Sequence, residues 1–147
     1  MKTIGLASDH AGFELKEFAK KYVETKEGYA CKDFGAYSAE SVDYPDYAHP
    51  LAEAVESGAV DSGIALCGSG NGISITLNKH RGIRAAICWT AELSGLARAH
   101  NDANVLVLPA RFISRDETGD IIDMFLTTPF SSGRHQQRIE KIPVPTG

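Results

Sequence analysis

Short apolar runs alternate along the chain with longer stretches whose apolar residues recur every three or four positions. Five of these runs have the length and composition of strands: residues 3–8, 30–34, 62–67, 83–88 and 104–108. The stretch after the first run is typical of an amphipathic helix, with one face formed by Leu15, Phe18, Ala19, Tyr22 and Val23. Such alternation is typical of repeated βα units around a parallel sheet, so the pattern predicts an α/β fold.

The same periodicity predicts four more helices. Ala48, Leu51, Ala52 and Val55 mark one of them, and residues 73–79 and 90–100 form two further ones. Ser114 and Glu117 have the S-x-x-E spacing of a capping box, and the apolar face that should follow it consists of Ile121, Ile122, Phe125 and Leu126. From about residue 131 the chain becomes a polar tail. Arg134 and Arg138 lie four positions apart there, on one face if the tail is helical.

Length and composition fit a single domain over residues 1–147 and exclude several classes of protein. With 147 residues, 43 % of them hydrophobic, one core is large enough for stability. The first residues are too weakly apolar for a signal peptide, and no segment approaches the ~20 apolar residues of a membrane span. We therefore expect a cytoplasmic protein. A formal charge of -4 without a basic run predicts neither nucleic-acid nor membrane binding.

The cysteine spacing does not match a disulfide framework or a zinc-binding motif. Cys31, Cys67 and Cys88 are odd in number and widely spaced, and no C-x-x-C pair is present. This pattern argues against disulfides and against a zinc knuckle, and we expect reduced thiols. Core packing is the default interpretation of Cys31 and Cys88.

Candidate chemistry gathers where the predicted strands end. Ligands of open parallel sheets bind at the carboxyl ends of the strands. SDHAG follows the first strand, CGSGNG the third, CWT spans the end of the fourth and PAR follows the fifth. HND at residues 100–102 differs, because it closes a helix and leads into the fifth strand.

The glycine loop at residues 67–72 fits neither common nucleotide-binding motif. The dinucleotide fingerprint G-x-G-x-x-G would need glycine at Ile73 or Ile75, and the P-loop would need G-K-[ST] where Gly72 is followed by Ile73. Two interpretations remain: a plain tight turn, or a loop whose N–H groups converge on a negative oxygen ahead of a helix.

Cys67 also has two interpretations. A lone cysteine that ends an apolar strand is commonly an inert core residue. Beside an amide-lined loop and a helix N-terminus, its thiolate would be favoured and could act as a nucleophile or a general base. A base that faces an anion hole can remove a proton next to a carbonyl and hold the enediolate that forms. The same loop would serve a thiol hydrolase, so the loop alone does not decide.

The candidate basic residues have structural alternatives as well. His10 could cap the helix that follows it, and His100 could satisfy a helix dipole. Arg134, His135 and Arg138 could form a solvated helix face, although paired guanidinium groups suit bidentate capture of phosphate. Ser8, Asp9 and His10 do not form a hydrolase triad, since adjacent residues rarely place the three groups in line.

Taken together, six segments in order resemble the ribose-5-phosphate isomerase B family, which includes galactose- and allose-6-phosphate isomerases. They are SDHAG, DYPDYA, CGSGNGISI, NKHRGIRAA, HNDANVL and GRHQQR, and the likeness covers essentially the whole chain. The resemblance implies a three-layer α/β/α sandwich, Rossmann-like, around a five-stranded parallel sheet. It also implies a homodimer or dimer of dimers with active sites shared between subunits, and no metal or cofactor.

The resemblance further implies a role for each matching residue. Cys67 would move the proton between C1 and C2, since the glutamate that some members carry six residues later is Ile73 here. Ser69 would assist transfer between the oxygens, and His100 with Asp9 would open the sugar ring. The enediolate would be held by the amides of the loop, which runs through Gly68, Ser69, Gly70, Asn71 and Gly72. Asn101 would bind sugar hydroxyls, and the phosphate would be bound by His10, Arg111, Arg134 and Arg138.

Arg111 matches less closely than Arg134 and Arg138, because PAR lacks the glycine that usually stands two residues before this arginine.

The resemblance as a whole implies an aldose–ketose isomerase that interconverts ribose 5-phosphate and ribulose 5-phosphate through a cis-enediolate. The alternatives are an allose- or galactose-6-phosphate isomerase, a sugar-phosphate sensor without catalysis, and a cysteine hydrolase.

Overall fold

The computed structural model describes residues 1–146 and contains one parallel sheet of five strands in the order β2-β1-β3-β5-β4. The strands are β1 (Lys2–Ser8), β2 (Tyr29–Asp33), β3 (Ser62–Cys67), β4 (Ala85–Ile87) and β5 (Val105–Pro109). Every pair of neighbouring strands is parallel, as the βα alternation predicts.

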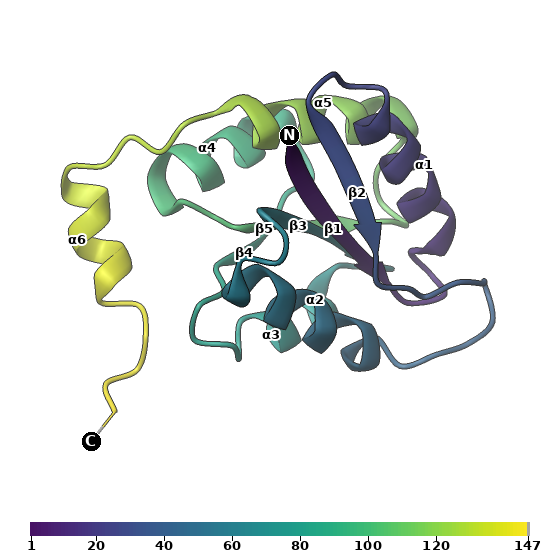
Figure 1. Cartoon of the computed structure of the whole chain (residues 1–147), viewed down its shortest axis with the longest axis horizontal. Coiled ribbons are helices and arrows are strands. Elements are labelled where there is room, and N and C mark those ends of the chain that lie inside the picture. The colour runs from purple at the N-terminus through teal and green to yellow at the C-terminus, as the bar shows by residue number, and fades with distance from the viewer. Residues whose placement is uncertain (147) are drawn as a thin grey trace.

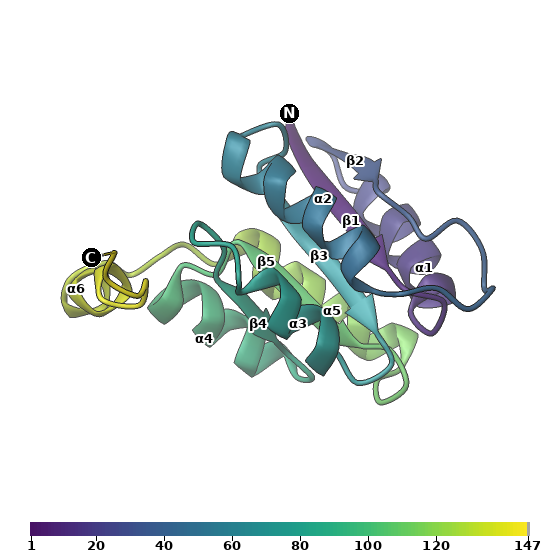
Figure 2. The same cartoon turned by 90° about the horizontal axis from the view of Figure 1, so that it is seen from below.

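Helices cover both faces of the sheet and complete the predicted α/β/α sandwich (Figures 1 and 2). They are α1 (Phe13–Glu24), α2 (Pro45–Ser57), α3 (Asn71–Leu77), α4 (Ala91–Asn101), α5 (Arg115–Thr127) and α6 (Arg134–Glu140). α1, α4 and α5 pack on one face around one apolar cluster, and α2 and α3 pack on the other face around a second. α6 stands apart from the sandwich, beyond α4 (Figure 1), and has no buried residue.

The predicted elements are present with shifted ends. The capping box is formed as predicted, since Ser114 Oγ accepts from the Glu117 N–H and the Glu117 carboxylate accepts from the Ser114 N–H. The fourth strand is shorter than residues 83–88, because side chains replace strand partners at its start. The Arg84 N–H donates to Asn104 Oδ1 and the Ala85 N–H donates to Asn78 Oδ1, both at 2.8 Å.

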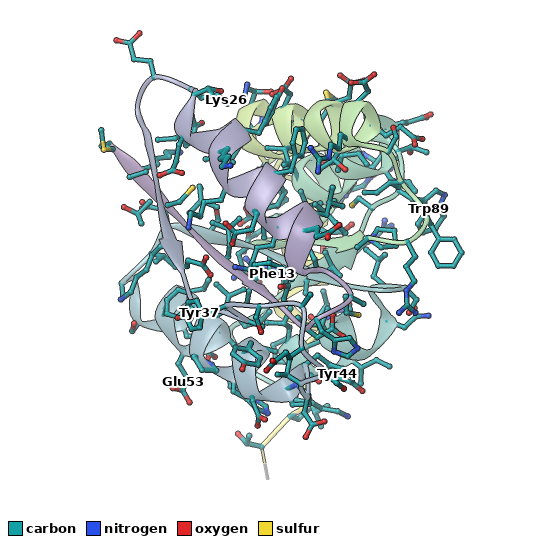
Figure 3. All side chains as sticks on the ribbon, turned by 90° about the vertical axis from the view of Figure 1, so that its right-hand side faces the viewer. Phe13, Lys26, Tyr37, Tyr44, Glu53 and Trp89 are labelled. Atoms are coloured by element: carbon teal, nitrogen blue, oxygen red, sulfur yellow. The ribbon has the colours of Figure 1, made fainter. Side chains whose placement is uncertain are left out.

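A buried ion pair joins α1 to the end of β2. The Lys16 side chain is 0 % exposed, and its Nζ lies 2.8 Å from each carboxylate oxygen of Asp33. The rings of Phe13 and Tyr37, labelled in Figure 3, lie within 6 Å of the same ammonium group. Burial alone would raise the pKa of Asp33, but hydrogen bonds from Lys16 and from the Gly35 N–H hold this pKa below its ordinary value.

Asp33→Asn is expected to lower the free energy of unfolding by about 3 kcal/mol, because it leaves a buried ammonium group without its bidentate partner. Urea denaturation at neutral pH measures this loss. Glu17→Gln is the matched control, since Glu17 also contacts Lys16 Nζ but is 34 % exposed, and it should cost less than about 1 kcal/mol.

The difference in free energy of unfolding between wild type and Asp33→Asn should depend on pH. A carboxyl group with a lowered pKa stabilises the fold above its ordinary pKa of about 4, and this contribution is lost as the pH falls through the lowered value. The gap between wild type and Asp33→Asn should therefore narrow below about pH 4. A gap that stays constant from pH 7 to pH 3 would contradict the assignment.

Among residues 1–146, no helix is both long enough and apolar enough to cross a membrane. The three cysteines are free, with Cys67 and Cys88 buried and Cys31 half-buried.

Candidate active site

Cys67 is the last residue of β3, and its side chain points to the layer formed by α2 and α3. Side chains alternate along the strand, so Ile64 and Leu66 belong to the cluster under α1 and α5, whereas Ala65 and Cys67 belong to the opposite one. Cys67 is only 5 % exposed, yet it lines an open cavity at the carboxyl edge of the sheet. The thiol is therefore held rigidly and still faces a ligand-sized space.

The glycine loop turns sharply between Cys67 and α3. Gly70 has φ +81° and precedes the first residue of α3, a conformation that a side chain would strain. A Cβ at this position would also lie 3.2 Å from Val107 Cγ1, so the loop packs directly on the sheet. The Asn71 N–H donates to Ser69 Oγ at 3.2 Å, which fixes the serine beside the start of the helix.

Two further glycines let side chains lie against the loop backbone. A Cβ at Gly68 would lie 3.2 Å from Arg111 Nη1, and a Cβ at Gly72 would lie 2.4 Å from Tyr44 Cζ. The segment after β5 is tied to the loop by two backbone bonds of 3.0 Å, from Ala110 to Cys67 and from Arg111 to Gly68. The guanidinium group is thereby brought next to the thiol-bearing strand end.

Asp9 and His10 form the opposite wall, at the end of β1. Asp9 is buried, and its Oδ1 accepts a hydrogen bond from the Gly12 N–H at 3.1 Å ahead of α1. His10 Nδ1 accepts from the Val42 N–H at 3.2 Å. The proton of a neutral His10 ring therefore sits on Nε2, which leaves that nitrogen as a donor for an anionic oxygen.

These side chains share one cavity of about 420 Å³. It is lined by Asp9, His10, Ala11, Tyr44, Cys67, Gly68, Ser69, Gly72, Arg111 and Phe112. Such a volume accommodates a small organic ligand. A buried thiol, a loop of backbone amides, a carboxylate and two basic side chains can together move a proton and hold an anion. Among the described residues, no cluster of three or more His, Cys, Asp or Glu side chains could ligate a metal.

A second hollow adjoins the first across the glycine loop. It has a volume of about 510 Å³ and is lined by Ser69, Asn71, Ile87, Trp89, Thr90, Pro109, Phe112 and Glu117. Trp89 projects from the body of the protein (Figure 3) and is 54 % exposed. Asn71, Trp89 and Thr90 thus face this hollow, whereas Cys88 of the CWT segment is buried in the core. Ser69 and Phe112 line both this hollow and the Cys67 cavity.

Four predicted site residues lie at the other edge of the sheet. His100 and Asn101 end α4 and precede the amino end of β5, while Arg134 and Arg138 lie on α6 beyond them. Gly63 is the register partner of Val105, and Cys67 is that of Pro109. At a rise of about 3.3 Å per residue the two edges are roughly 13 Å apart along these strands. One chain therefore contains two separate halves of the predicted site.

The turn after His100 is held by two arginines. Asp102 directly follows α4 and has the left-handed conformation, with φ 46°. Arg98 Nη1 donates to Asp102 Oδ1 at 2.8 Å, and Arg84 Nε donates to the carbonyl oxygens of Asn101 and Asp102. These contacts leave the side chains of His100 and Asn101 exposed at the helix end.

Three cavity residues, Ala11, Tyr44 and Phe112, are absent from the set that the sequence analysis assigned, and Ala11 lies within the SDHAG segment. Tyr44 belongs to the DYPDYA segment, but only the fold places its ring against Gly72, 28 positions away. Phe112 follows Arg111 and is 73 % exposed, and an aromatic residue directly after a predicted anion ligand was the available signal.

A sequence model of the family described as Ribose/Galactose Isomerase matches residues 4–142 of the chain. The chain belongs to this family. It is 45 % identical to ribose-5-phosphate isomerase B of Escherichia coli over 143 residues, which are 97 % of this chain and 95 % of the relative. The resemblance drawn from the six sequence segments is confirmed.

Solved structures of family members agree with the fold throughout. A ribose 5-phosphate isomerase from Thermotoga maritima superposes with a TM-score of 0.94 at 51 % identity, covering 97 % of both chains. Ribose-5-phosphate isomerase B from Mycoplasma genitalium, solved with bound ribulose-5-phosphate, superposes with a TM-score of 0.90 at 40 % identity, covering 95 % of this chain and 93 % of that one.

Proposed function

We propose that the protein interconverts ribose 5-phosphate and ribulose 5-phosphate. The observation that carries this proposal is the cavity at the carboxyl edge, where Cys67, the loop amides, His10 and Arg111 meet. Family membership at 45 % identity to an isomerase of this substrate supports it, as does a relative solved with ribulose-5-phosphate bound.

Proton transfer would take place between Cys67 and the adjacent carbons C1 and C2 of the sugar. The thiolate takes the proton from C2 of the open-chain aldose, and the electron pair moves into an enediolate. The thiol then returns the proton to C1, while Ser69 passes the hydroxyl proton between O1 and O2. The N–H groups of residues 69–72 hold the oxygen on which negative charge develops.

The phosphate would be bound at the cationic end of the site. Within one chain, His10 Nε2 and Arg111 are available for this role. A dianionic phosphate favours further guanidinium groups, and the partner subunit's Arg134 and the partner subunit's Arg138 would supply them. These two side chains are exposed on α6, which carries no buried residue and projects from the body (Figure 1).

The functional unit would be a homodimer with two shared sites. Each chain contributes a cysteine half at the carboxyl edge and a histidine half, with His100 and Asn101, at the amino edge. In a two-fold dimer, each half can meet the complementary half of the other chain. The partner subunit's His100, assisted by Asp9, would open the furanose ring, and the partner subunit's Asn101 would bind sugar hydroxyls.

Turnover of ribose 5-phosphate by the purified protein in a chelating buffer tests the proposal, because the proposed mechanism uses no metal. Allose 6-phosphate and galactose 6-phosphate serve as parallel substrates. Conversion of the pentose supports the proposal, and conversion of a hexose phosphate alone would overturn the substrate assignment. Tight binding of all three without turnover would favour a sensor. A trapped thioester in mass spectra would instead favour a hydrolase.

A cytoplasmic location is proposed with this role, since pentose phosphates are intracellular metabolites.

A further inference from the structure

His100 and His135 form a parallel stack between α4 and α6. Their ring centroids lie 4.3 Å apart and the ring planes differ by 11°. The segment before α6 is anchored to the same helix, because the Ser131 N–H donates to the Ala99 carbonyl oxygen at 2.9 Å. The other pair of histidine rings, His49 and His80, is tilted by 53° and shares a direct hydrogen bond instead. The stack is therefore a specific arrangement of the histidine half of the site.

The surroundings of His135 disfavour protonation of its ring. Its pKa lies below the ordinary value because of desolvation, and because a proton on its ring would be repelled by a protonated His100 and by Arg134 and Arg138. The nearby acids do not offset these charges: Asp102 on α4 is bound by Arg98 and Arg84. Glu140 on α6 accepts a hydrogen bond from Gln136. At neutral pH, His100 thus has a flat, uncharged ring against one face.

We propose that His135 is a positioning residue for His100, whose neutral ring fixes the orientation of the His100 imidazole and stabilises it when it carries the ring-opening proton. This inference rests on the proposed isomerase function. A neutral aromatic face stabilises an adjacent cation, whereas a protonated His135 would repel it. The fixed ring plane also matters, because small misplacements of a proton donor reduce its rate contribution strongly.

Ring opening and proton transfer at carbon can be measured separately in this reaction. Ribulose 5-phosphate has no furanose form, because its phosphate occupies the hydroxyl group that would close the ring onto C2. Exchange of its C1 proton with deuterium oxide therefore requires Cys67 and the loop, and it does not require ring opening. Consumption of ribose 5-phosphate requires both steps. A residue that positions His100 should affect the second measurement and leave the first nearly unchanged.

His135→Ala is expected to lower kcat for ribose 5-phosphate by at least about tenfold, with a smaller change in KM. NMR should show C1 exchange of ribulose 5-phosphate within about twofold of wild type. His135→Phe keeps a flat neutral ring and should restore most of kcat. It should also extend activity to lower pH, because it removes the protonation of His135. Gln137→Ala, an exposed change on the same helix, is the matched control.

Equal losses of exchange and of ribose 5-phosphate consumption in His135→Ala would overturn the positioning role and indicate general damage to the site. Failure of His135→Phe to recover more activity than His135→Ala would overturn it as well. Absence of both C1 exchange and ribose 5-phosphate consumption in the wild-type protein would refute the proposed function, and the positioning role with it. NMR titration of His135 reports on the stack without turnover: the pKa should rise toward its ordinary value in His100→Gln, and an unchanged titration would contradict the coupling.

Discussion

Cys67→Ala is expected to lower kcat for ribose 5-phosphate by about 10³-fold, since a positioned general base contributes 10²- to 10⁴-fold to proton transfer. No other proton acceptor at the end of β3 could replace the thiolate, because Ile73 occupies the position of the alternative glutamate. The change removes one sulfur atom from a cavity whose other walls come from different elements. Binding of ribose 5-phosphate, measured by calorimetry, should therefore stay within a few-fold of wild type.

The other two cysteines provide matched controls. Burial raises the pKa of both Cys31 and Cys88 to about 11, so these groups remain thiols at neutral pH. Neither lines the Cys67 cavity. Cys31→Ala and Cys88→Ala should keep kcat near the wild-type value, although each opens space in the core. Residual turnover in Cys67→Ala above a few per cent would assign the base to another residue.

The strand ends were predictable because a parallel sheet has strong local signals. Apolar runs fix the strands, and the βα alternation places SDHAG, CGSGNG and PAR at the carboxyl edge, where the structure brings them together in one cavity. HND follows a helix rather than a strand, which already separates it from these segments along the chain. Segments that follow strands therefore form the cysteine half of the site, and the segment at the helix end belongs to the histidine half.

Contacts between distant positions could not be predicted in the same way. A helical pattern leaves lysine on the solvent face, and only its partner Asp33, seventeen residues later, explains why Lys16 is buried. The stack of His100 on His135 depends on how the tail returns to α4. The hydrophobic pattern of the sequence could not predict this contact, because α6 buries no residue and therefore has no apolar face.

A mixture of two inactive variants is expected to regain activity if the sites are shared between subunits. Cys67→Ala disables the cysteine half of a chain, and His100→Gln disables the histidine half. In a mixed dimer one site receives both defects, and the other receives none. Random pairing makes half of the dimers mixed, so co-expression in equal amounts should restore about a quarter of wild-type activity.

The control pairs two defects of the same half. Cys67→Ala and Arg111→Ala both alter the carboxyl-edge cavity, so every site of their mixed dimer contains one defect and activity should not return. Native mass spectrometry on differently tagged chains verifies that mixed dimers form in both experiments. If Cys67→Ala and His100→Gln form mixed dimers without regaining turnover, the shared site is wrong. The roughly 13 Å between the two edges would then need a rearrangement within one chain, which a packed parallel sheet does not allow.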